Sequence, residues 1–249
     1  MCILKVKNLS VESRTEDGKN PSPLLKQVNA TVRKNKITAL IGESGAGKTI
    51  FARAISALLP ERIHVTSGTF FYDGTEVDFN RLKRFRGRKI FYSPQNAAAS
   101  LNPVIRIKKQ IDEVSNIPFP SLIEILTFLN IANPLKLLNA YPFELSEGES
   151  QRALLAMAIA INARLLILDE PVSALDGDSR QNFMELLQHL QQKYAVTILL
   201  ITHNLSIIKH IAHYIYIIQQ GEIVESGETT ALFREPRHAY TKEIVDLLP

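Results

Sequence analysis

The segment ALIGESGAGKTIFARAISALL, residues 39–59, constrains the fold of this chain more than any other feature. It contains the pattern G-x-x-x-x-G-K-[ST] from Gly42 to Thr49, after the apolar run ITALI and before a helix predicted from Thr49 to Leu59. The glycines of the pattern permit backbone torsions that turn successive N–H groups toward phosphate oxygens. The segment therefore predicts a phosphate-binding strand, loop and helix within an α/β fold.

The same loop supplies the residues that we expect to hold a nucleotide. Lys48 is expected to reach the β- and γ-phosphates, and the hydroxyl of Thr49 is expected to bind Mg²⁺. A glycine-rich turn that binds nothing is the alternative, but spacing, lysine, threonine and flanks all agree with the first interpretation. The expected nucleotide-binding residues are Gly42, Glu43, Ser44, Gly45, Ala46, Gly47, Lys48, Thr49 and Ile50.

A second motif, LLILDEP, completes such a site. Asp169 ends a predicted buried strand, where it can hold the metal through water, and Glu170 is placed to orient or deprotonate the attacking water. An Asp-Glu pair at the end of a strand is common by chance. Together with the glycine-rich loop, however, it indicates a nucleoside triphosphatase.

Short apolar runs alternate with helical patterns along the chain, which indicates an α/β protein with a parallel sheet. Two more strands, YIYII and EIVES, are expected to form a hairpin through Gln220 and Gly221. Between Ala98 and Ala140 the pattern changes to helical segments separated by prolines, which we interpret as a helical insertion. The four predicted sheet strands are ITALI (37–41), KIFYS (89–93), LLILD (165–169) and VTILLIT (196–202), and further helices are expected at 151–161, 179–194 and 205–213.

Composition excludes several classes of protein. The net charge of +4 is too small to indicate a nucleic-acid binder, and the single cysteine, Cys2, cannot form an intramolecular disulfide, which fits a reducing cytoplasmic setting. No signal peptide or membrane-spanning stretch is predicted. The basic run RLKRFRGRK (81–89) could suggest nucleic acid, but we predict a solvated, poorly structured segment. His210 and His213 are not expected to bind metal, because no third ligand accompanies them.

The motifs resemble those of ATPase subunits of ABC transporters, in the same order and along essentially the whole chain. The added motifs are YSPQN with Gln95, LSEGE at the signature position, SALD (173–176) as the D-loop and LITHN with His203. The resemblance implies a P-loop NTPase core with a mainly parallel sheet, an N-terminal antiparallel β region and a helical insertion. It further implies one nucleotide-binding domain, 1–249, with a RecA-like core at about 1–97 and 162–249 and a helical subdomain at about 98–161.

The resemblance also assigns roles. It implies that Gln95 touches Mg²⁺ and water, and that His203 bonds the γ-phosphate and holds Glu170 and water in line. Taken alone, Gln95 could be an ordinary loop residue, and the segment around His203 could merely cap a helix through Thr202 or Asn204. In the family two subunits enclose ATP between them, so the resemblance implies that Ser146, Gly148 and Asp176 bind nucleotide at the dimer interface. It places the Ser146 hydroxyl and the Gly148 N–H on the γ-phosphate.

Two segments narrow the resemblance to importers of oligopeptides, dipeptides and nickel: SLNPVIRIKKQIDEV, and the ending REPRHAYTKEIVDLL. The implied partners are transmembrane permeases, a second ATPase subunit and, indirectly, an extracytoplasmic solute-binding protein, with no nucleic acid. A heterodimer is favoured over a homodimer, and the expected location is the cytoplasmic face of the membrane. The given sequence has no cysteine-rich ending, and in this it resembles the shorter subunits that serve nickel or metal-chelate uptake.

The chain departs from the family pattern in three places. The stretch VESRTEDGKNPSPLLKQVN lacks the aromatic residue that usually stacks on adenine, and Ile50 replaces a second hydroxyl after Thr49. Glu149 forms a predicted capping box with Ser146. Glu147 would repel a γ-phosphate by roughly 2 kcal/mol at ~7 Å and a dielectric of ~20, unless its side chain points away or a basic partner neutralises it. Because a signature acts on the opposite nucleotide, this predicts an asymmetric dimer.

The leading hypothesis is therefore an importer motor that uses ATP and Mg²⁺. A nucleic-acid-handling ABC ATPase is one alternative, motivated by the basic run. A nucleotide-gated module that barely hydrolyses is another, motivated by Glu147 and the missing aromatic residue.

Overall fold

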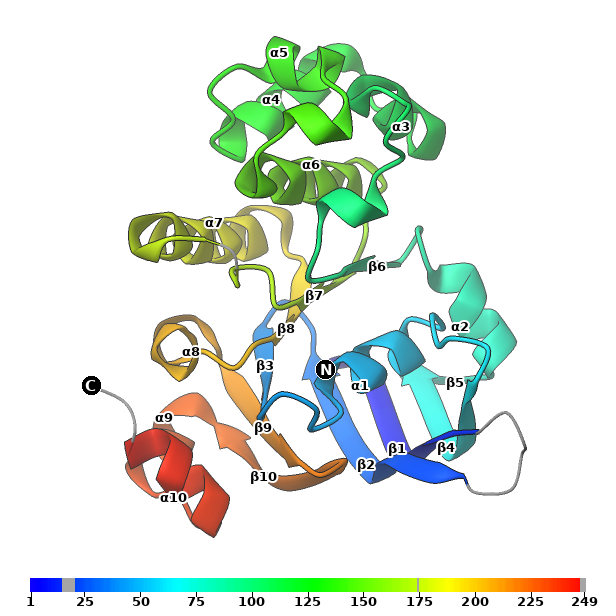
Figure 1. Cartoon of the computed structure of the whole chain (residues 1–249), viewed down its shortest axis with the longest axis vertical. Helices are drawn as coiled ribbons and strands as arrows, with labels where there is room; N and C mark the ends of the chain where they lie inside the picture. The colour runs from blue at the N-terminus through cyan, green and yellow to red at the C-terminus, as the bar shows by residue number, and fades with distance from the viewer. Residues whose placement is uncertain (15–20, 174, 247–249) are drawn as a thin grey trace.

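The computed structural model describes residues 1–14, 21–173 and 175–246, and two β-sheets organise this part of the chain (Figure 1). One sheet has the order β2-β1-β4-β5 and is antiparallel. The other has the order β10-β9-β3-β8-β7-β6 and is parallel except for its edge strand β10. The strands are β1 (Cys2–Ser13), β2 (Ser22–Arg33), β3 (Ile37–Ile41), β4 (Ile63–Tyr72), β5 (Thr75–Val77), β6 (Ile90–Ser93), β7 (Leu165–Asp169), β8 (Thr197–Ile201), β9 (Tyr214–Gln219) and β10 (Glu222–Glu228).

The six-stranded sheet confirms the predicted α/β core. Strands β3 and β7 have the predicted bounds, and every residue of β3, β7 and β8 is buried, because helices or the second sheet cover both faces. Strands β9 and β10 form the predicted hairpin, with Gln220 at a φ of 48° and Gly221 at 81°. The antiparallel sheet is the N-terminal β region that the family resemblance implied.

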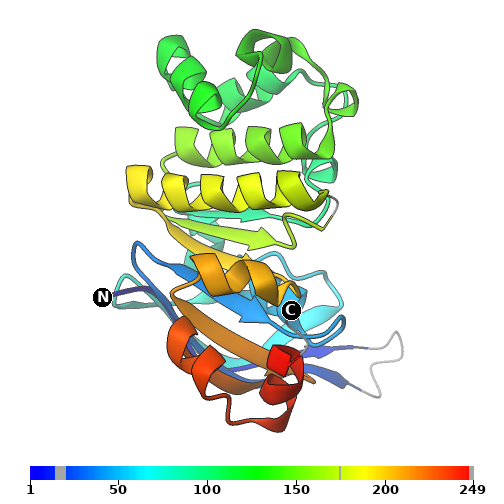
Figure 2. The same cartoon turned by 90° about the vertical axis from the view of Figure 1, so that its left-hand side faces the viewer.

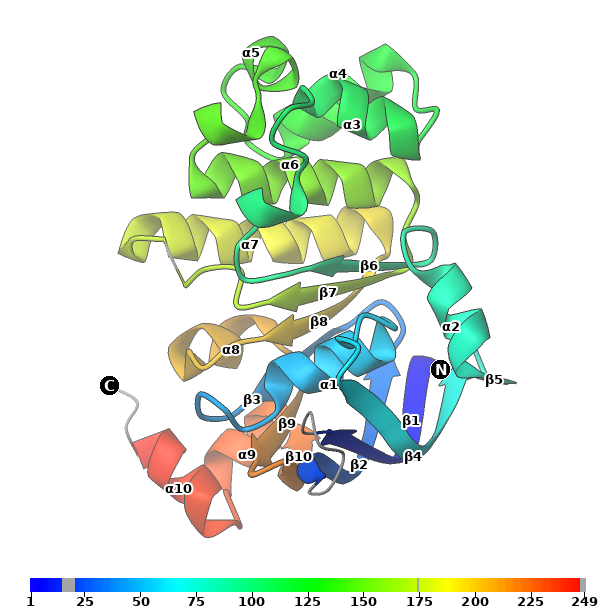
Figure 3. The same ribbon diagram turned by 45° about the vertical axis from the view of Figure 1, so that its right-hand side comes forward.

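Helix α1 (Lys48–Ile55) lies between the two sheets (Figure 3). Its apolar face packs in one cluster with residues of β1, β2 and β4 on one side and β3, β7 and β8 on the other. The helix ends before the predicted Leu59, because Ala57 adopts a left-handed φ of 53°. The hydroxyl of Ser56 donates to the carbonyl of Ala52 at 2.7 Å and helps to close this last turn.

Four helices cover the opposite face of the six-stranded sheet (Figure 2). Helix α7 packs on β7 and β8 within the largest apolar cluster, and α8, α9 and α10 share a smaller cluster with β3 and β9. His213, just after α8, accepts a hydrogen bond from the Ile37 amide, and burial lowers the pKa of this histidine. The helices are α7 (Gly177–Tyr194), α8 (Leu205–Ile211), α9 (Thr229–Arg234) and α10 (Ala239–Asp246).

Every regular element between β6 and β7 is a helix, and irregular stretches join these helices, which agrees with the helical segments predicted between Ala98 and Ala140. These helices stand at one end of the molecule (Figure 1), and α6 lies beside α7 in all three ribbon views. Apolar side chains of α4, α6 and α7 share one cluster, so the insertion continues the core of the sheet. Its elements are η1 (Ala98–Ser100), α3 (Ile107–Val114), α4 (Phe119–Phe128), α5 (Pro134–Asn139), η2 (Pro142–Glu144) and α6 (Glu147–Ala160).

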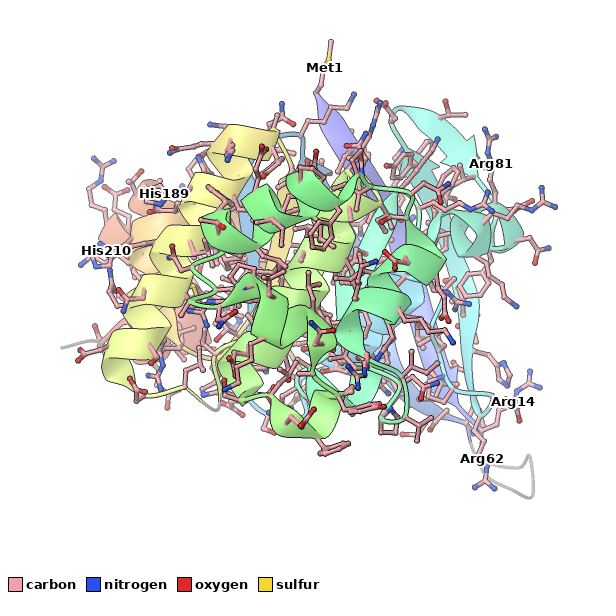
Figure 4. The ribbon with its side chains drawn as sticks, turned by 90° about the horizontal axis from the view of Figure 1, so that it is seen from above. Met1, Arg14, Arg62, Arg81, His189 and His210 are labelled. Atoms are coloured by element: carbon pink, nitrogen blue, oxygen red, sulfur yellow. The ribbon has the colours of Figure 1, made fainter. Side chains whose placement is uncertain are left out.

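The basic run is solvated as predicted, but the prediction that it is poorly structured was wrong for its first half, which is helical. Helix α2 (Phe79–Phe85) begins at Asp78, whose carboxylate accepts a hydrogen bond from the Arg81 amide at 2.6 Å. Leu82 is fully buried and fixes the helix against the antiparallel sheet. The basic side chains therefore lie on the outer side of a capped helix, and Arg81 points outward at one edge of the molecule (Figure 4).

Within the described ranges, none of the helices has the length and apolar character needed to cross a bilayer.

Candidate active site

A cleft of about 740 Å³ opens where the loop between β3 and α1 meets the carboxyl ends of β7 and β8. Carboxyl ends of parallel strands are where open α/β sheets bind ligands. The cleft is lined by Ser22, Pro23, Leu24, Lys26, Ser44, Gly45, Gly47, Lys48, Thr49, Ile50, Gln95, Glu170, His203, Gln220 and Gly221. It therefore collects the glycine-rich loop, Gln95, Glu170 and His203, which are far apart in the sequence.

The glycine-rich loop has the backbone that its sequence predicted. Gly45 and Gly47 have φ values of 83° and 106°, in the left-handed region that glycine tolerates best. Gly42 is required for a different reason: a Cβ atom there would lie 2.2 Å from the carbonyl oxygen of Ile218. The loop also packs on the β9–β10 turn, where the Gly221 amide donates to the Ala46 carbonyl at 3.0 Å.

Lys48 begins α1 and is 8% exposed. Its ammonium donates to the carbonyl oxygens of Gly42 and Glu43, at 2.7 and 2.8 Å. Burial lowers the pKa of Lys48, although the carboxylates of Glu170 and Asp169 oppose that shift. A buried cation above a loop of backbone amides is an arrangement suited to polyphosphate.

Asp169 lies at the end of β7 and is nearly inaccessible. Its carboxylate accepts hydrogen bonds from the Thr49 hydroxyl at 3.3 Å and from the Tyr92 hydroxyl at 2.9 Å. Burial raises the pKa of Asp169, and these two hydrogen bonds partly offset the rise. Burial, followed by the nearby Asp169 charge, raises the pKa of Tyr92 to about 12. Sequence analysis missed Tyr92, which lies on β6, the strand that pairs with β7, three residues before Gln95.

Glu170 and His203 form a pair at the mouth of the cleft. The His203 Nδ1 atom lies 3.0 Å from Glu170 Oε1, while the other carboxylate oxygen of Glu170 is buried and has no hydrogen-bond partner among the described residues. Glu170 has a φ of 50°, a strained conformation for a residue with a side chain. Its amide is held by the carbonyl of Ile201 at 2.8 Å, which fixes the strained turn to the end of β8.

Gln95 is exposed and reaches the cleft from the loop after β6. Its side-chain amide lies 3.5 Å from the Ser173 hydroxyl, which in turn donates to the carbonyl of Glu170 at 3.1 Å. Gln95 is thus connected through Ser173 to the backbone of Glu170, whose carboxylate pairs with His203.

The signature residues and Asp176 do not line this cleft. Ser146 and Glu149 form the predicted capping box at the start of α6, with the Glu149 amide 3.2 Å from the Ser146 hydroxyl and the Ser146 amide 3.0 Å from the Glu149 carboxylate. Gly148 lies in the first turn of α6. Asp176 caps α7 by accepting from the amide and hydroxyl of Ser179, each at 2.9 Å, and these hydrogen bonds lower the pKa of Asp176. Of the SALD motif, Ala174 lies outside the described residues.

Glu147 has a contact that sequence analysis did not foresee. Its carboxylate accepts a hydrogen bond from the Ala97 amide at 3.1 Å. Ala97 is fully buried at the entrance to the helical insertion, just after Gln95. The side chain thereby joins the first turn of α6 to the segment that leaves β6.

Two segments outside the sequence motifs also line the cleft. Ser22, Pro23 and Leu24 belong to the start of β2, and Gln220 and Gly221 to the β9–β10 turn. No aromatic side chain is among the described residues that line the cleft. The only sequence signal for the start of β2 and the β9–β10 turn was the predicted hairpin at Gln220 and Gly221. The rest was not predictable, because the strands that present these residues pair over long distances in the chain.

Comparison with known proteins finds a matching family model and several similar proteins. Residues 25–173 match the model of the family described as "ABC transporter". The chain is 31% identical to the metal-staphylopine import system ATP-binding protein CntD of Staphylococcus aureus, over 98% of this chain and 93% of that protein. It is 32% identical to the nickel import system ATP-binding protein NikD of S. aureus, over 98% and 95%. It is also 32% identical to the oligopeptide transport ATP-binding protein OppD of Bacillus subtilis, over 99% and 72%.

Solved structures agree on the fold. The dimeric ATP-binding cassette MJ0796, bound to ADP and Pi in a post-hydrolysis state, superimposes with a TM-score of 0.77 and 22% identity, covering 91% of this chain and 98% of that one. CbiO1 of Clostridium perfringens, part of an ABC transporter complex, gives a TM-score of 0.75 at 22% identity, over 94% and 91%. The three relatives are all ATP-binding proteins of import or transport systems, and they give no support to a nucleic-acid-handling role.

Proposed function

This chain belongs to the ABC transporter family, and we propose that it is the ATP-binding and ATP-hydrolysing motor subunit of an importer for peptides, nickel or metal chelates. The observation that carries the proposal is that the glycine-rich loop with Lys48, Thr49, and the Glu170–His203 pair all line one cleft, and that the Thr49 hydroxyl bonds the buried Asp169 behind it. Its relatives belong to transport systems for all three substrates, so we propose the substrate class no more narrowly than this.

The donor atoms of the cleft fit a magnesium nucleotide. Magnesium takes oxygen ligands and is usually held in such sites by one or two protein groups together with substrate phosphates. Thr49 and Asp169 present two oxygens 3.3 Å apart, and Gln95 adds an amide oxygen. We infer that these three residues hold Mg²⁺, which when bound neutralises charge that develops on the phosphates.

Glu170 is proposed as the catalytic base. Glu170 lines the cleft, one of its carboxylate oxygens is buried and has no partner among the described residues, and His203 lies 3.0 Å from the other oxygen. The carboxylate can therefore take one hydrogen bond from a water molecule, orient it toward the γ-phosphate and accept its proton. Lys48 and backbone amides of the glycine-rich loop would hold the phosphates while this occurs.

The remaining residues are proposed to act across a dimer. Ser146, Gly148 and Asp176 lie outside the cleft of their own chain, which is the placement expected if they complete the site of a second subunit. We propose a second ATPase subunit, with a heterodimer favoured, and permease subunits at the cytoplasmic face of the membrane. We further propose a division into a core at about 1–97 and 162–249 and a helical subdomain at about 98–161.

The test separates binding from hydrolysis. With Mg²⁺ and ATP, Glu170→Gln should retain ATP binding and lose at least about 100-fold in phosphate release, because the acceptor for the water proton is gone. Lys48→Ala should lose binding itself. Glu76→Gln, an exposed carboxylate on β5, is the matched control and should behave as the unmodified chain. Unchanged turnover in Glu170→Gln would refute the assignment of Glu170 as base.

A further inference from the structure

The C-terminal helix reaches the phosphate-binding loop through one side chain. Tyr240, in the first turn of α10, is 5% exposed, and its hydroxyl accepts a hydrogen bond from the Glu43 amide at 2.9 Å. Glu43 lies in the glycine-rich loop between β3 and α1. The two residues are 197 positions apart in the sequence, so only the tertiary structure joins them.

The contact holds one particular peptide unit. The peptide bond between Gly42 and Glu43 presents the carbonyl of Gly42 and the amide of Glu43. Lys48 donates to that carbonyl at 2.7 Å, and the amide donates to Tyr240. The peptide is therefore fixed at both of its polar ends, and its orientation also sets the point at which the buried ammonium of Lys48 is held.

Tyr240 is itself held firmly. Its ring packs in an apolar cluster with side chains of β3, β9, α8 and α9. The segment before α10 is bound by Glu225 of β10, whose carboxylate accepts from the amides of Arg237 and His238 at 3.0 and 2.9 Å. The tyrosine hydroxyl therefore has little freedom, and a rigid acceptor can orient the loop amide.

We propose that Tyr240 is a positioning residue for nucleotide binding: by fixing the Gly42–Glu43 peptide, it preorganises the loop that receives the triphosphate. Loss of the hydroxyl leaves the amide end of this peptide without its acceptor, so that nucleotide binding must order that end. The affinity for the phosphates falls in consequence, whereas the hydrolytic pair of Glu170 and His203 is untouched. This inference rests on the proposed ATPase function and adds a residue to it.

The test uses Tyr240→Phe, which removes the hydroxyl and retains the packed ring. One neutral hydrogen bond corresponds to roughly a fivefold change in an equilibrium constant, so we expect the Kd and KM for Mg-ATP to rise about five- to tenfold. The kcat at saturating ATP should stay within about twofold. The affinity for tripolyphosphate, measured by displacement of a fluorescent ATP analogue, should fall by the same factor as the affinity for ATP. The reason is that the loop contacts the phosphates and not the base.

The chain offers a matched control in Tyr216→Phe. Tyr216 is also buried, and its hydroxyl accepts from the Thr31 amide at 2.8 Å and donates to the Thr31 carbonyl at 3.2 Å, away from the glycine-rich loop. Tyr216→Phe should lower the melting temperature without raising the KM for Mg-ATP. An unchanged KM in Tyr240→Phe, an equal rise in Tyr216→Phe, or a fall in kcat in place of a rise in KM would overturn the proposal while leaving ATP hydrolysis by the unmodified chain intact. No ATP binding by the unmodified chain would overturn the proposed function as well.

Discussion

Replacement of Glu147 tests what this carboxylate of the LSEGE signature contributes to the stability of its own chain. The structure gives this carboxylate a local partner, the amide of the fully buried Ala97 at 3.1 Å. A hydrogen bond to a charged group contributes about 1.5–3 kcal/mol, and a buried donor left without an acceptor costs about 1–3 kcal/mol. Glu147 also gains up to about 0.5 kcal/mol from the positive end of α6.

These magnitudes predict different outcomes for two substitutions. Glu147→Ala removes the acceptor and should lower the free energy of unfolding by about 2 kcal/mol, after roughly 0.5 kcal/mol is regained from the helix propensity of alanine. Glu147→Gln keeps an acceptor oxygen and should lose only about 0.5–1 kcal/mol. For a chain of this size, 1 kcal/mol corresponds to about 2–4 °C in Tm, so Glu147→Ala should melt about 4–8 °C lower.

Thermal and urea unfolding followed by circular dichroism measure these differences. Glu113→Ala, on an exposed position of α3, is the control and should change stability by less than about 0.5 kcal/mol. If Glu147→Ala and Glu147→Gln melt at the same temperature, the hydrogen bond to Ala97 is not what the glutamate contributes, and the reasoning fails.

A second pair of variants, Glu147→Gly and Glu147→Gln, tests the charge repulsion separately from stability. The bond to Ala97 directs the carboxylate without removing its charge, so the repulsion of a partner-bound γ-phosphate stays a prediction. Glu147→Gly should strengthen ATP-driven dimer closure, and Glu147→Gln should do so without losing the bond to Ala97. Size-exclusion chromatography of the Glu170→Gln background with ATP measures closure. Equal or weaker closure in Glu147→Gln would count against the repulsion.

Two further substitutions test the geometry of the cleft. Tyr92→Phe removes the hydroxyl that donates to Asp169 at 2.9 Å and should raise the Mg²⁺ concentration for half-maximal hydrolysis about three- to tenfold, measured by magnesium titration at saturating ATP; an unchanged titration would show that this bond does not orient the carboxylate. Gly42→Ala places a Cβ atom 2.2 Å from the Ile218 carbonyl and should lower the free energy of unfolding by about 1–3 kcal/mol and abolish ATP binding. Normal melting and binding in that variant would mean that the loop and β9 can separate at little cost.

Local patterns in the sequence determined the core elements and much of the candidate active site. The continuous apolar runs specified β3 and β7 to the residue, because both faces of these strands are covered. The Ser146–Glu149 capping box specified the start of α6, because its hydrogen bonds join residues three apart. The glycine-rich loop, Asp169 and Glu170 were found for the same reason: each belongs to a short motif whose neighbours define its conformation.

Tertiary structure alone decided the contacts between distant segments. The bonds of Tyr92 to Asp169, of Glu147 to Ala97 and of Tyr240 to Glu43 depend on which strands and helices lie side by side. Helix α2 was missed because its stability comes from Leu82, which is buried against the antiparallel sheet, more than from its basic sequence. Periodicity and short motifs report local geometry, whereas the orientation of a catalytic group depends on hydrogen bonds that close only when the chain is packed.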